Sequence, residues 1–359
     1  MITNIDLNFY KENGYLIIRN FLTKDKISKL NKRYKELRRK LAKQSKIKQE
    51  DYDKEISQIR DIWRLEEDYN RLILKEEISL TAPLFFLDQS CRLLHDHIIN
   101  KPINNNGIVP WHQDYTYWPT DNPNGLSFWL PFSDLDANAG VLQVVPKSHL
   151  WGEDKPIDFM NDEKDFSNHN IQYLTVNKGD LVILDALTWH RSSNNISVKE
   201  RIAYITLWIS TSSRYAPKHA SWHPVNDNVE VNEGEVLNDN WFPVIGTKKI
   251  MNQKTPYRYN DSTEDMSKIT MFNASKITRN FLQKHLEKEE NIWQYLYDEN
   301  NLKDAVHKLT DLFKLSKNNE KELQEILHSM SINGMAYQNH RARNVYNKSY
   351  VKFKKIFKI

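Results

Sequence analysis

The segment Asp180-Leu-Val-Ile-Leu-Asp-Ala-Leu-Thr-Trp-His190 is an apolar strand pattern that ends in a histidine, and a second apolar run, Arg201–Ile209, follows it. Earlier runs of the same kind cover residues 91–99, 126–132 and 140–145. Short strands at this spacing, broken by Asn, Gly, Pro and Asp, are typical of an antiparallel sandwich or barrel. We therefore predict a mainly β core of the jelly-roll type (double-stranded β-helix, cupin-like) in the middle of the chain.

Helical patterns flank this core on both sides, after a first strand expected at residues 15–19. From residue 23 to about residue 75, apolar residues recur at spacings of three and four, the period of amphipathic helices. A similar pattern from residue 275 to residue 330 predicts a helical hairpin or bundle. We predict two domains: residues 1–270, with helices packed on the jelly roll, and residues 271–359, a helical extension with a basic tail.

Composition excludes several classes of protein. The chain has 359 residues, of which 27% are charged and 39% hydrophobic, and no run of eighteen apolar residues that could span a membrane. The net charge of +4 is too small to indicate a nucleic-acid partner, and the basic runs at 26–48 and 348–358 are typical of solvated helix faces or tails. A single cysteine, Cys91, and an N-terminus without a secretory pattern predict a cytoplasmic protein. No pattern defines an oligomeric state.

Three residues indicate a metal site. In the segment Trp111–Tyr115, His112 and Asp114 are two positions apart, and side chains at that spacing on a strand point to one face. Alone, such a pair is also common on protein surfaces. His190 follows at the end of an apolar strand, and two histidines with one carboxylate are the facial triad of non-haem Fe(II) oxygenases.

Arg201 indicates a second, anionic ligand. It begins the apolar strand that follows His190, and a guanidinium among apolar residues is costly unless it meets an anion. A co-substrate that fits both features is 2-oxoglutarate, which can chelate Fe(II) through its C1 carboxylate and C2 keto oxygen. Its C5 carboxylate would then pair with Arg201, and the remaining iron position would be left for O2.

Four ordered motifs closely resemble those of the phytanoyl-CoA dioxygenase family. They are Leu94–Pro102 (Leu-His-Asp-His-Ile-Ile-Asn-Lys-Pro), Trp111–Pro119 (Trp-His-Gln-Asp-Tyr-Thr-Tyr-Trp-Pro), Gly140–His149 (Gly-Val-Leu-Gln-Val-Val-Pro-Lys-Ser-His), and His190 with Arg201. The opening segment, residues 9–19, also looks like the first strand of that family. The resemblance covers roughly residues 5–245.

The resemblance assigns roles to particular residues. It implies that His112, Asp114 and His190 are the iron ligands and that Arg201 anchors the co-substrate. It also places His97 and Trp129 in the co-substrate pocket. Lys101 shares a strand face with His97 by alternation, so we expect it to point inward as well.

The chain departs from the family pattern at two positions. Lys147 stands where a glycine is usual in the Pro-x-Ser-His turn, whose role we expect to be structural, so His149 is not predicted as a ligand. Ala203 stands where many relatives have a serine that contacts the co-substrate. Tyr204 or Thr206 could supply that hydrogen bond if the strand is bulged.

Several aromatic and histidine residues are open to two interpretations. Tyr115, Tyr117 and Trp118 follow the first ligand pair and could either line a substrate pocket or belong to the core. His219 and His223 could reach the mouth of the pocket from a loop, or form surface hydrogen bonds.

The expected activity is oxidation, most simply hydroxylation, of an unactivated C–H bond with release of succinate and CO2. Related halogenating enzymes have a small residue in place of the carboxylate ligand, so Asp114 favours hydroxylation. The substrate is expected to be a small molecule: a secondary metabolite, an amino-acid-like compound or an acyl thioester. A rival hypothesis is a non-catalytic module that binds a partner or carrier protein and retains a vestigial barrel. The complete set of iron ligands argues against that hypothesis. A second rival, a metal-binding protein of the same fold without redox chemistry, would not need the buried Arg201.

Overall fold

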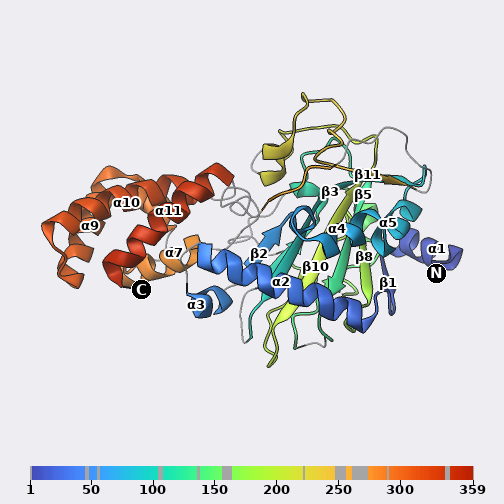
Figure 1. Ribbon diagram of the computed structural model, residues 1–359, viewed down its shortest axis with the longest axis horizontal. Helices are drawn as coiled ribbons and strands as arrows, with labels where there is room; N and C mark the ends of the chain where they lie inside the picture. Colours follow the sequence, from blue (N-terminus) through green and yellow to red (C-terminus); the bar gives the residue numbers. More distant parts are fainter. Residues whose placement is uncertain are drawn as a thin grey trace. The chain divides into compact units, whose positions relative to one another are not determined.

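The computed structural model describes residues 2–44, 48–54, 57–103, 108–135, 138–155, 164–220, 223–246, 256–260, 274–288, 291–335 and 340–358. The chain divides into two compact units, Met1–Lys40 with Glu50–Met271, and Leu41–Gln49 with Phe272–Ile359. Two β-sheets and the helices that cover them form the first unit. In the described residues the second unit is helical (Figure 1).

Two antiparallel sheets form the jelly roll. The larger has the order β1-β8-β5-β10-β3-β11. Strand β2 also pairs with β3, on the edge that β11 occupies but further along the strand. Its strands are β1 (Tyr15–Ile18), β8 (Leu181–Asp185), β5 (Gly125–Pro131), β10 (Arg201–Ile209), β3 (Ser90–Lys101), β11 (Val244–Gly246) and β2 (Ser57–Arg60). The smaller sheet has the order β4 (Val109–His112), β9 (His190–Ser192), β6 (Leu142–Val144) and β7 (Gln172–Tyr173). The predicted mainly β fold is confirmed.

Strand β10 is buried along its whole length because both of its faces are covered. On one face, the ring of Tyr204 meets that of Tyr69 from helix α4 (Glu67–Leu74), with centroids 4.9 Å apart. On the other face, Ile205 and Leu207 belong to the same apolar cluster as Leu142 of the smaller sheet. An apolar run without alternation is what a strand buried on both faces requires.

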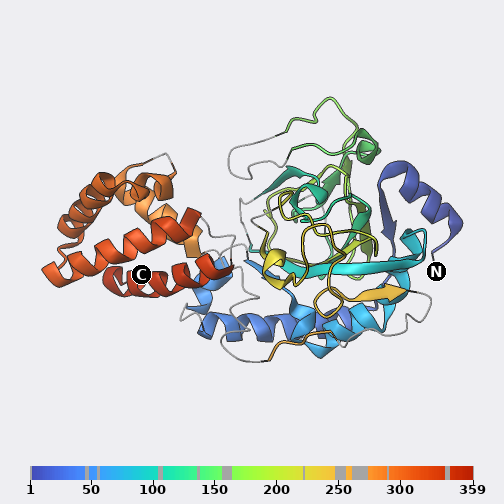
Figure 2. The ribbon, with the colours of Figure 1, turned by 90° about the horizontal axis from the view of Figure 1, so that it is seen from above.

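Helices α2 (Lys24–Gln44), α4 and α5 (Glu77–Thr81) cover the outer face of the larger sheet. The other helices of the N-terminal part are α1 (Asn4–Asn13) and α3 (Gln49–Lys54). Short 3-10 helices are η1 (Ile62–Arg64), η2 (Ala82–Phe85), η3 (Tyr115–Tyr117), η4 (Ser148–Trp151) and η5 (Pro224–Asn228). Figures 1 and 2 show α2 crossing the outer face of the larger sheet, while residues 138–155, in green, lie on its other side.

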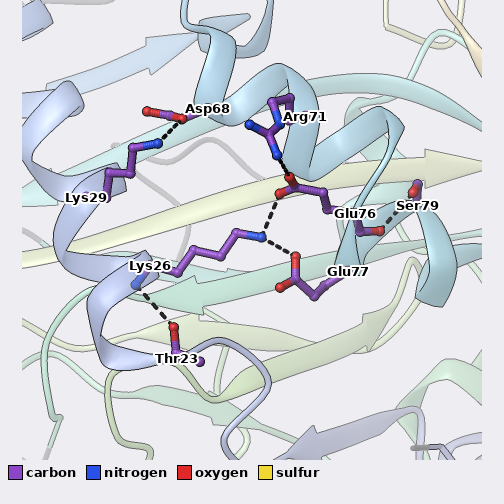
Figure 3. Close-up of polar contacts among 8 residues, drawn as sticks. All are labelled: Thr23, Lys26, Lys29, Asp68, Arg71, Glu76, Glu77 and Ser79. Carbon is purple, nitrogen blue, oxygen red and sulfur yellow. Dashed lines mark hydrogen bonds and ion pairs between the residues drawn. The ribbon is translucent and has the colours of Figure 1, made fainter.

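Helix α2 packs through the apolar face that its sequence predicts. Ile27, Leu30, Tyr34 and Leu37, spaced by three and four, are buried. Beside this face, Lys26 pairs with Glu76 at 2.6 Å and with Glu77 (Figure 3). Two further pairs appear in the same view, Lys29–Asp68 at 2.6 Å and Arg71–Glu76 at 2.7 Å. These charges link α2 to α4 and α5.

The helical interpretation of residues 23–75 is incomplete, because strand β2 interrupts it. Residues Ser57–Arg60 pair with β3, and Ile59 is fully buried. The segment has one apolar residue and lies between highly charged helices, so local periodicity gives no sign of a strand. Its pairing partner is about forty residues away in sequence.

The C-terminal unit contains α7 (Ala274–Leu286), α8 (Ile292–Tyr297), α9 (Glu299–Phe313), α10 (Lys317–Met335) and α11 (His340–Phe357). Leu302, Ala305, Val306 and Leu309 form the buried face of α9 at spacings of three, four and seven. The predicted helical extension is confirmed, and the basic segment expected as a tail is helix α11. No helix among the described residues is both long and apolar enough to cross a membrane.

Candidate metal centre

Two histidines face each other across strands β4 and β9. His112 ends β4, His190 begins β9, and the two are register partners with ring centroids 4.2 Å apart. Nδ1 of His112 lies 2.8 Å from the carbonyl oxygen of Pro110, and Nδ1 of His190 lies 2.9 Å from that of Thr188. Because a carbonyl only accepts hydrogen bonds, each Nδ1 carries the proton, and Nε2 is the atom that offers a lone pair.

Asp114 completes the cluster. Its Oδ1 atom lies 3.6 Å from Nε2 of His112 and 3.6 Å from Nε2 of His190. The ligand atoms of all three residues lie within 4.8 Å of one another. The side chains of His112 and Asp114 are 11% and 17% exposed, so the cluster is accessible from solvent. Two imidazole nitrogens and one carboxylate at this spacing suit a first-row transition metal.

The convergence of His112 and Asp114 has a different cause from the one that strand alternation predicts. Strand β4 ends at His112, and Asp114 has a helical backbone (φ −64°, ψ −40°) at the start of η3. Gln113 fixes the turn: its side chain donates to the carbonyl oxygens of Gly152 and Leu187, both at 2.8 Å, and accepts from the N–H of Asp154. Ser127 on β5 then donates to Oδ2 of Asp114.

The protonation states of His190 and Asp114 suit metal binding. Burial lowers the pKa of His190 to about 4, with a further contribution from His112, so the ring is neutral at pH 7. Burial disfavours the charged form of Asp114. The nearby imidazoles and Ser127 outweigh that effect, and the pKa of the carboxyl is below its usual range. Metal ligands must be neutral imidazole and carboxylate, the forms that His190 and Asp114 take here.

Arg201 lies at the start of β10, fully within the protein. Its side chain is 1% exposed, its Nε atom has no hydrogen-bond partner, and no carboxylate among the described residues pairs with it. The guanidinium carbon lies 4.9 Å from the ring centroid of Trp129 on β5. Burial lowers the pKa of Arg201 to about 9. Arg201 and Trp129, both predicted to belong to the co-substrate pocket, are therefore neighbours, and the described residues provide no anion for the guanidinium.

Lys101 is a second buried basic residue beside Arg201. The two are register partners on β3 and β10, and Lys101 is 0% exposed. Its Nζ donates to the carbonyl oxygens of Ser192 (3.1 Å) and Ser193 (2.7 Å) and to Oγ of Ser192 (2.9 Å). Burial, followed by the charge of Arg201, lowers the pKa of Lys101 to about 6. The inward orientation predicted for Lys101 therefore agrees with the structure.

His97 lies on the same face of the larger sheet as Arg201. It is the register partner of Ile205, which in turn is opposite Trp129 on β5. The Nδ1 atom of His97 is buried, and the part of the chain that the structure describes offers it no hydrogen-bond partner. Burial and the neighbouring His95 lower the pKa of His97 well below its usual value, so the ring is neutral.

Tyr204 and Thr206 do not replace the serine that is missing at Ala203. Tyr204 donates from Oη to Oδ2 of Asp96 at 2.7 Å, and Oγ1 of Thr206 accepts from Nε1 of Trp208 at 2.8 Å. Both side chains lie on the helix-covered face, because the register shift in β10 falls only after Leu207. This alternative prediction was wrong.

Sequence reasoning missed two serines that the structure places at the site. Ser192, two positions after His190 on β9, holds Lys101, and Ser127, two positions before Trp129 on β5, holds Asp114. Strand alternation from residues already singled out was the signal that could have identified both.

The aromatic and histidine residues that the sequence left open to two interpretations have different surroundings in the structure. Tyr115 and Trp118 are buried in the core cluster, with Tyr117 partly buried beside Trp111 and Trp189. His219 contacts Glu153 at 2.5 Å and the carbonyl oxygen of Trp118 at 2.6 Å.

His223 instead stacks near His95, with ring centroids 5.2 Å apart. This contact brings a loop residue next to strand β3.

The Pro-x-Ser-His turn is structural, as expected. Oγ of Ser148 accepts from the N–H of Trp189 at 2.9 Å, next to His190. His149 lies 3.1 Å from the carbonyl oxygen of Lys11 and is not part of the metal cluster. Lys147 has φ +67°, so the left-handed conformation that glycine favours is kept although the glycine is not.

A model of the phytanoyl-CoA dioxygenase (PhyH) family matches residues 10–203, more than half of the chain. The chain belongs to the phytanoyl-CoA dioxygenase family. Mouse peroxisomal phytanoyl-CoA dioxygenase is 29% identical over 214 residues, which cover 52% of this chain and 62% of that protein. The human protein is 27% identical over the same length and coverage. The match thus spans less than two thirds of these mammalian relatives.

Solved structures support the fold expected of this family. The epimerase SnoN in complex with Fe3+, alpha ketoglutarate and nogalamycin RO has a TM-score of 0.55 at 18% identity, covering 67% of this chain and 97% of SnoN. The alpha ketoglutarate dependent carbocyclase SnoK from nogalamycin biosynthesis has a TM-score of 0.54 at 19% identity, covering 68% and 96%. At such low identity these matches establish the jelly-roll fold and nothing finer.

Proposed function

We propose that this member of the phytanoyl-CoA dioxygenase family is an Fe(II)- and 2-oxoglutarate-dependent oxygenase. The observation that carries the proposal is Arg201, a buried guanidinium to which the described residues offer no carboxylate partner, in the same unit as a cluster of two histidines and one carboxylate. Burying an unpaired cation is costly, so its retention indicates an anion that binds there. The SnoN structure, a complex with Fe3+ and alpha ketoglutarate, has the same fold.

The residues present fit both groups. His112, Asp114 and His190 would hold the metal, leaving adjacent positions for other ligands. Arg201, with Lys101 beside it, would receive the distal carboxylate of 2-oxoglutarate. Ser192 accepts a hydrogen bond from Lys101 and lies two residues from His190, about 7 Å along the strand. A five-carbon dicarboxylate can bridge this separation.

When bound, iron, O2 and 2-oxoglutarate would supply the oxidising power, with oxidative decarboxylation of 2-oxoglutarate to succinate and CO2. The protein's own groups orient the ligand side chains. The carbonyls of Pro110 and Thr188 fix the two imidazoles, and Ser127 and Gln113 fix Asp114. Trp129 covers the anchor and limits the access of water to it.

Hydroxylation of a small-molecule substrate is the reaction that we propose. Asp114 occupies the ligand position that halogenating relatives leave to chloride, so the chain lacks space for a halide there. We further propose that the protein acts in the cytoplasm, in keeping with Cys91 as a buried, unoxidised thiol.

Binding and turnover test the proposal directly. Anaerobic protein with Fe(II) and 2-oxoglutarate should develop the weak visible charge-transfer band of the chelate, and O2 should then yield succinate. His112→Ala should lose both signals because the ligand set is incomplete, while circular dichroism remains unchanged. His149→Ala, a histidine outside the cluster, is the matched control and should keep both. Succinate formation at the parental rate by His112→Ala would contradict the proposal.

A further inference from the structure

Arg60 is a buried arginine on the same sheet face as the candidate site. It ends strand β2, where it is the register partner of His97 on β3. Register partners in antiparallel strands point to the same face, with Cβ atoms about 5 Å apart. Arg60 is 3% exposed. Its guanidinium therefore belongs to the face that carries His97, Ile205 and Trp129.

The guanidinium of Arg60 has unmet hydrogen-bonding capacity. Its Nη1 atom is buried and has no hydrogen-bond partner among the described residues, and the same is true of Nδ1 of His97 opposite it. Arg64, the other buried arginine of this segment, differs. It donates to the carbonyl oxygens of Tyr257, at 3.0 Å, and Trp241. Among the described residues, Nη1 of Arg60 thus lacks the kind of backbone acceptor that both Nη atoms of Arg64 have, although Nε of Arg64 is also without a hydrogen-bond partner.

Buried acids do not balance the charge of these arginines. Asp61 lies 3.2 Å from Nε of Arg60 and 3.4 Å from Nε of Arg64, so one carboxylate serves two guanidiniums. The other buried acid nearby is Asp96, which accepts hydrogen bonds from Tyr204 and from the N–H of Trp63. Burial and the charge of Asp61 raise the pKa of Asp96 to about 8, so it is mainly neutral at pH 7. The cluster carries a net positive charge.

Three imidazoles surround this charge. The ring centroid of His95 lies 5.3 Å from that of His97 and 5.2 Å from that of His223. Burial and the charge of Arg60 lower the pKa of His95 to about 3, and the pKa values of His97 and His223 lie well below the usual value. Neutral rings can donate N–H groups without adding charge. One fixed cation with neutral donors suits a singly charged, planar anion better than a phosphate.

This anion site is distinct from the proposed anchor of 2-oxoglutarate. His97, opposite Arg60, lies four residues along β3 from Lys101, opposite Arg201, a separation of about 13 Å. Arg60 and Arg201 also lie on strands on opposite sides of β3, and 2-oxoglutarate held by the metal cluster and Arg201 would have no free carboxylate for Arg60. The Arg60 site nevertheless lies near the metal cluster. His95, Leu207 and Ser127 form one row across β3, β10 and β5, and Ser127 contacts Asp114 about 10 Å from His95.

We propose that Arg60, with His97 and His95 beside it, binds a carboxylate group of the primary substrate and so orients a carbon several bonds away toward the metal cluster. The substrate class is therefore a small carboxylic acid. The orientation over iron rests on the proposed function, whereas recognition of the carboxylate by Arg60 does not.

Matched acids and amides test this recognition without knowledge of the natural substrate. The protein is loaded with Mn(II) and 2-oxoglutarate without O2. It is then titrated with monocarboxylates of four to ten carbons, linear and aromatic, and with their primary amides. Calorimetry gives Kd, and relaxation of ligand protons by Mn(II) reports distance from the metal. Acids should bind about 10- to 100-fold more tightly than amides, the effect of one charge-assisted pair. Equal binding of acids and amides would overturn the proposal.

Variants locate the contact. Arg60→Gln should lose the preference for acids, Arg60→Lys should keep part of it, and Arg33→Gln, an exposed arginine, should behave as the parent. The Kd for 2-oxoglutarate should not change in any of them. A weaker Kd for 2-oxoglutarate in Arg60→Gln, with acid binding intact, would make Arg60 a co-substrate residue and refute the proposal. If Arg60→Gln does not fold, Arg60→Lys and the acid–amide comparison still decide.

The two proposals can fail separately. Acid binding that depends on Arg60 but causes no metal-dependent relaxation would leave carboxylate recognition standing and refute the orientation over the metal. Succinate formation without any preference for acids would support the oxygenase and refute the Arg60 site.

Discussion

Arg201 is the residue whose surroundings most require a ligand. Its guanidinium is buried over Trp129, and its register partner on β3 is Lys101, whose pKa of about 6 leaves the amine mainly neutral at pH 7. Without an anion the charged form of each side chain is unfavourable, and a carboxylate would favour the charged form of both. The preference of this site for a dicarboxylate thus follows from two basic side chains that the fold holds in register.

Arg201→Ala should weaken 2-oxoglutarate binding. Removing one partner of a buried charge-assisted pair costs on the order of 2 to 4 kcal/mol, which corresponds to about a 30- to 1000-fold increase in the apparent KM for 2-oxoglutarate. The kcat at saturation should fall much less. Arg191→Ala serves as the control, because this arginine pairs with Gln143 and lies over Trp111, outside the anchor. An unchanged KM in Arg201→Ala would place the anchor elsewhere.

Gly179 is a glycine that both backbone conformation and space require. It has φ +89°, and a Cβ atom there would lie 2.4 Å from the carbonyl oxygen of Leu22. Gly234 has a similar φ of +83° but open space around it. Gly234→Ala should cost about 1 kcal/mol of unfolding free energy, and Gly179→Ala about 2 to 5 kcal/mol because the clash adds to the strain. Urea denaturation measures both, and equal losses would contradict the clash.

At the scale of single residues, the sequence predicts which residues form the site better than it predicts what surrounds each of them. His112, Asp114, His190 and Arg201 could be singled out by residue type and spacing. Whether an arginine is satisfied depends on its neighbours in space, so the contrast between Arg60 and Arg64 could not be predicted. The turn at Asp114 likewise depends on Gln113 reaching carbonyls that are 39 and 74 residues away.

At the scale of elements, the strands that carry the site are the predictable part. Long apolar strands such as β10 and β3 are buried on both faces and have strong local signals. Strand β2 is short, polar and paired over a long distance, so its sequence does not distinguish it from the helices around it. The site residue on β2, Arg60, was missed for the same physical reason.

The ion pairs that join α2 to α5 make a modest contribution to stability. Lys26 is 24% exposed and serves two acids, Glu76 and Glu77, which would otherwise repel each other. Lys26→Met should lower the unfolding free energy by about 1 kcal/mol, since partly exposed pairs are screened by solvent. Most of this difference should disappear in 1 M salt. Lys24→Met, an exposed lysine on the same helix, should change stability by less than about 0.5 kcal/mol. A loss that salt does not reduce would mean that packing, not charge, is responsible.

At the scale of the whole molecule, two buried groups give stability a characteristic dependence on pH. The pKa of Asp96 is raised from 3.8 to about 8 in the folded chain, chiefly by burial. The folded chain therefore holds a proton that the unfolded chain loses, and this stabilisation is lost as pH rises from about 4 to 8. The pKa of Lys101 is lowered from 10.5 to about 6, also chiefly by burial. Here the unfolded chain holds the extra proton, so stability increases as pH rises from about 6 to 10.5.

The two effects oppose each other and overlap between about pH 6 and 8, so their separate slopes appear on either side of that window. Asp96→Asn, which keeps an acceptor for Tyr204 and Trp63, should remove a decline of up to about 1.4 kcal/mol per pH unit between pH 4 and 6. Lys101→Met should remove a rise of similar slope between pH 8 and 10. Urea midpoints of the parent and of each variant are measured across pH 4.5 to 9.5. Subtracting each variant's profile from the parental profile removes the contributions of all other titrating groups. If both variants followed the parental profile, neither buried group would govern the pH dependence of stability.

Addition of 2-oxoglutarate should flatten only the alkaline slope of the stability profile. Its carboxylate would stabilise the protonated form of Lys101, while Asp96, on the opposite face of β3, is unaffected.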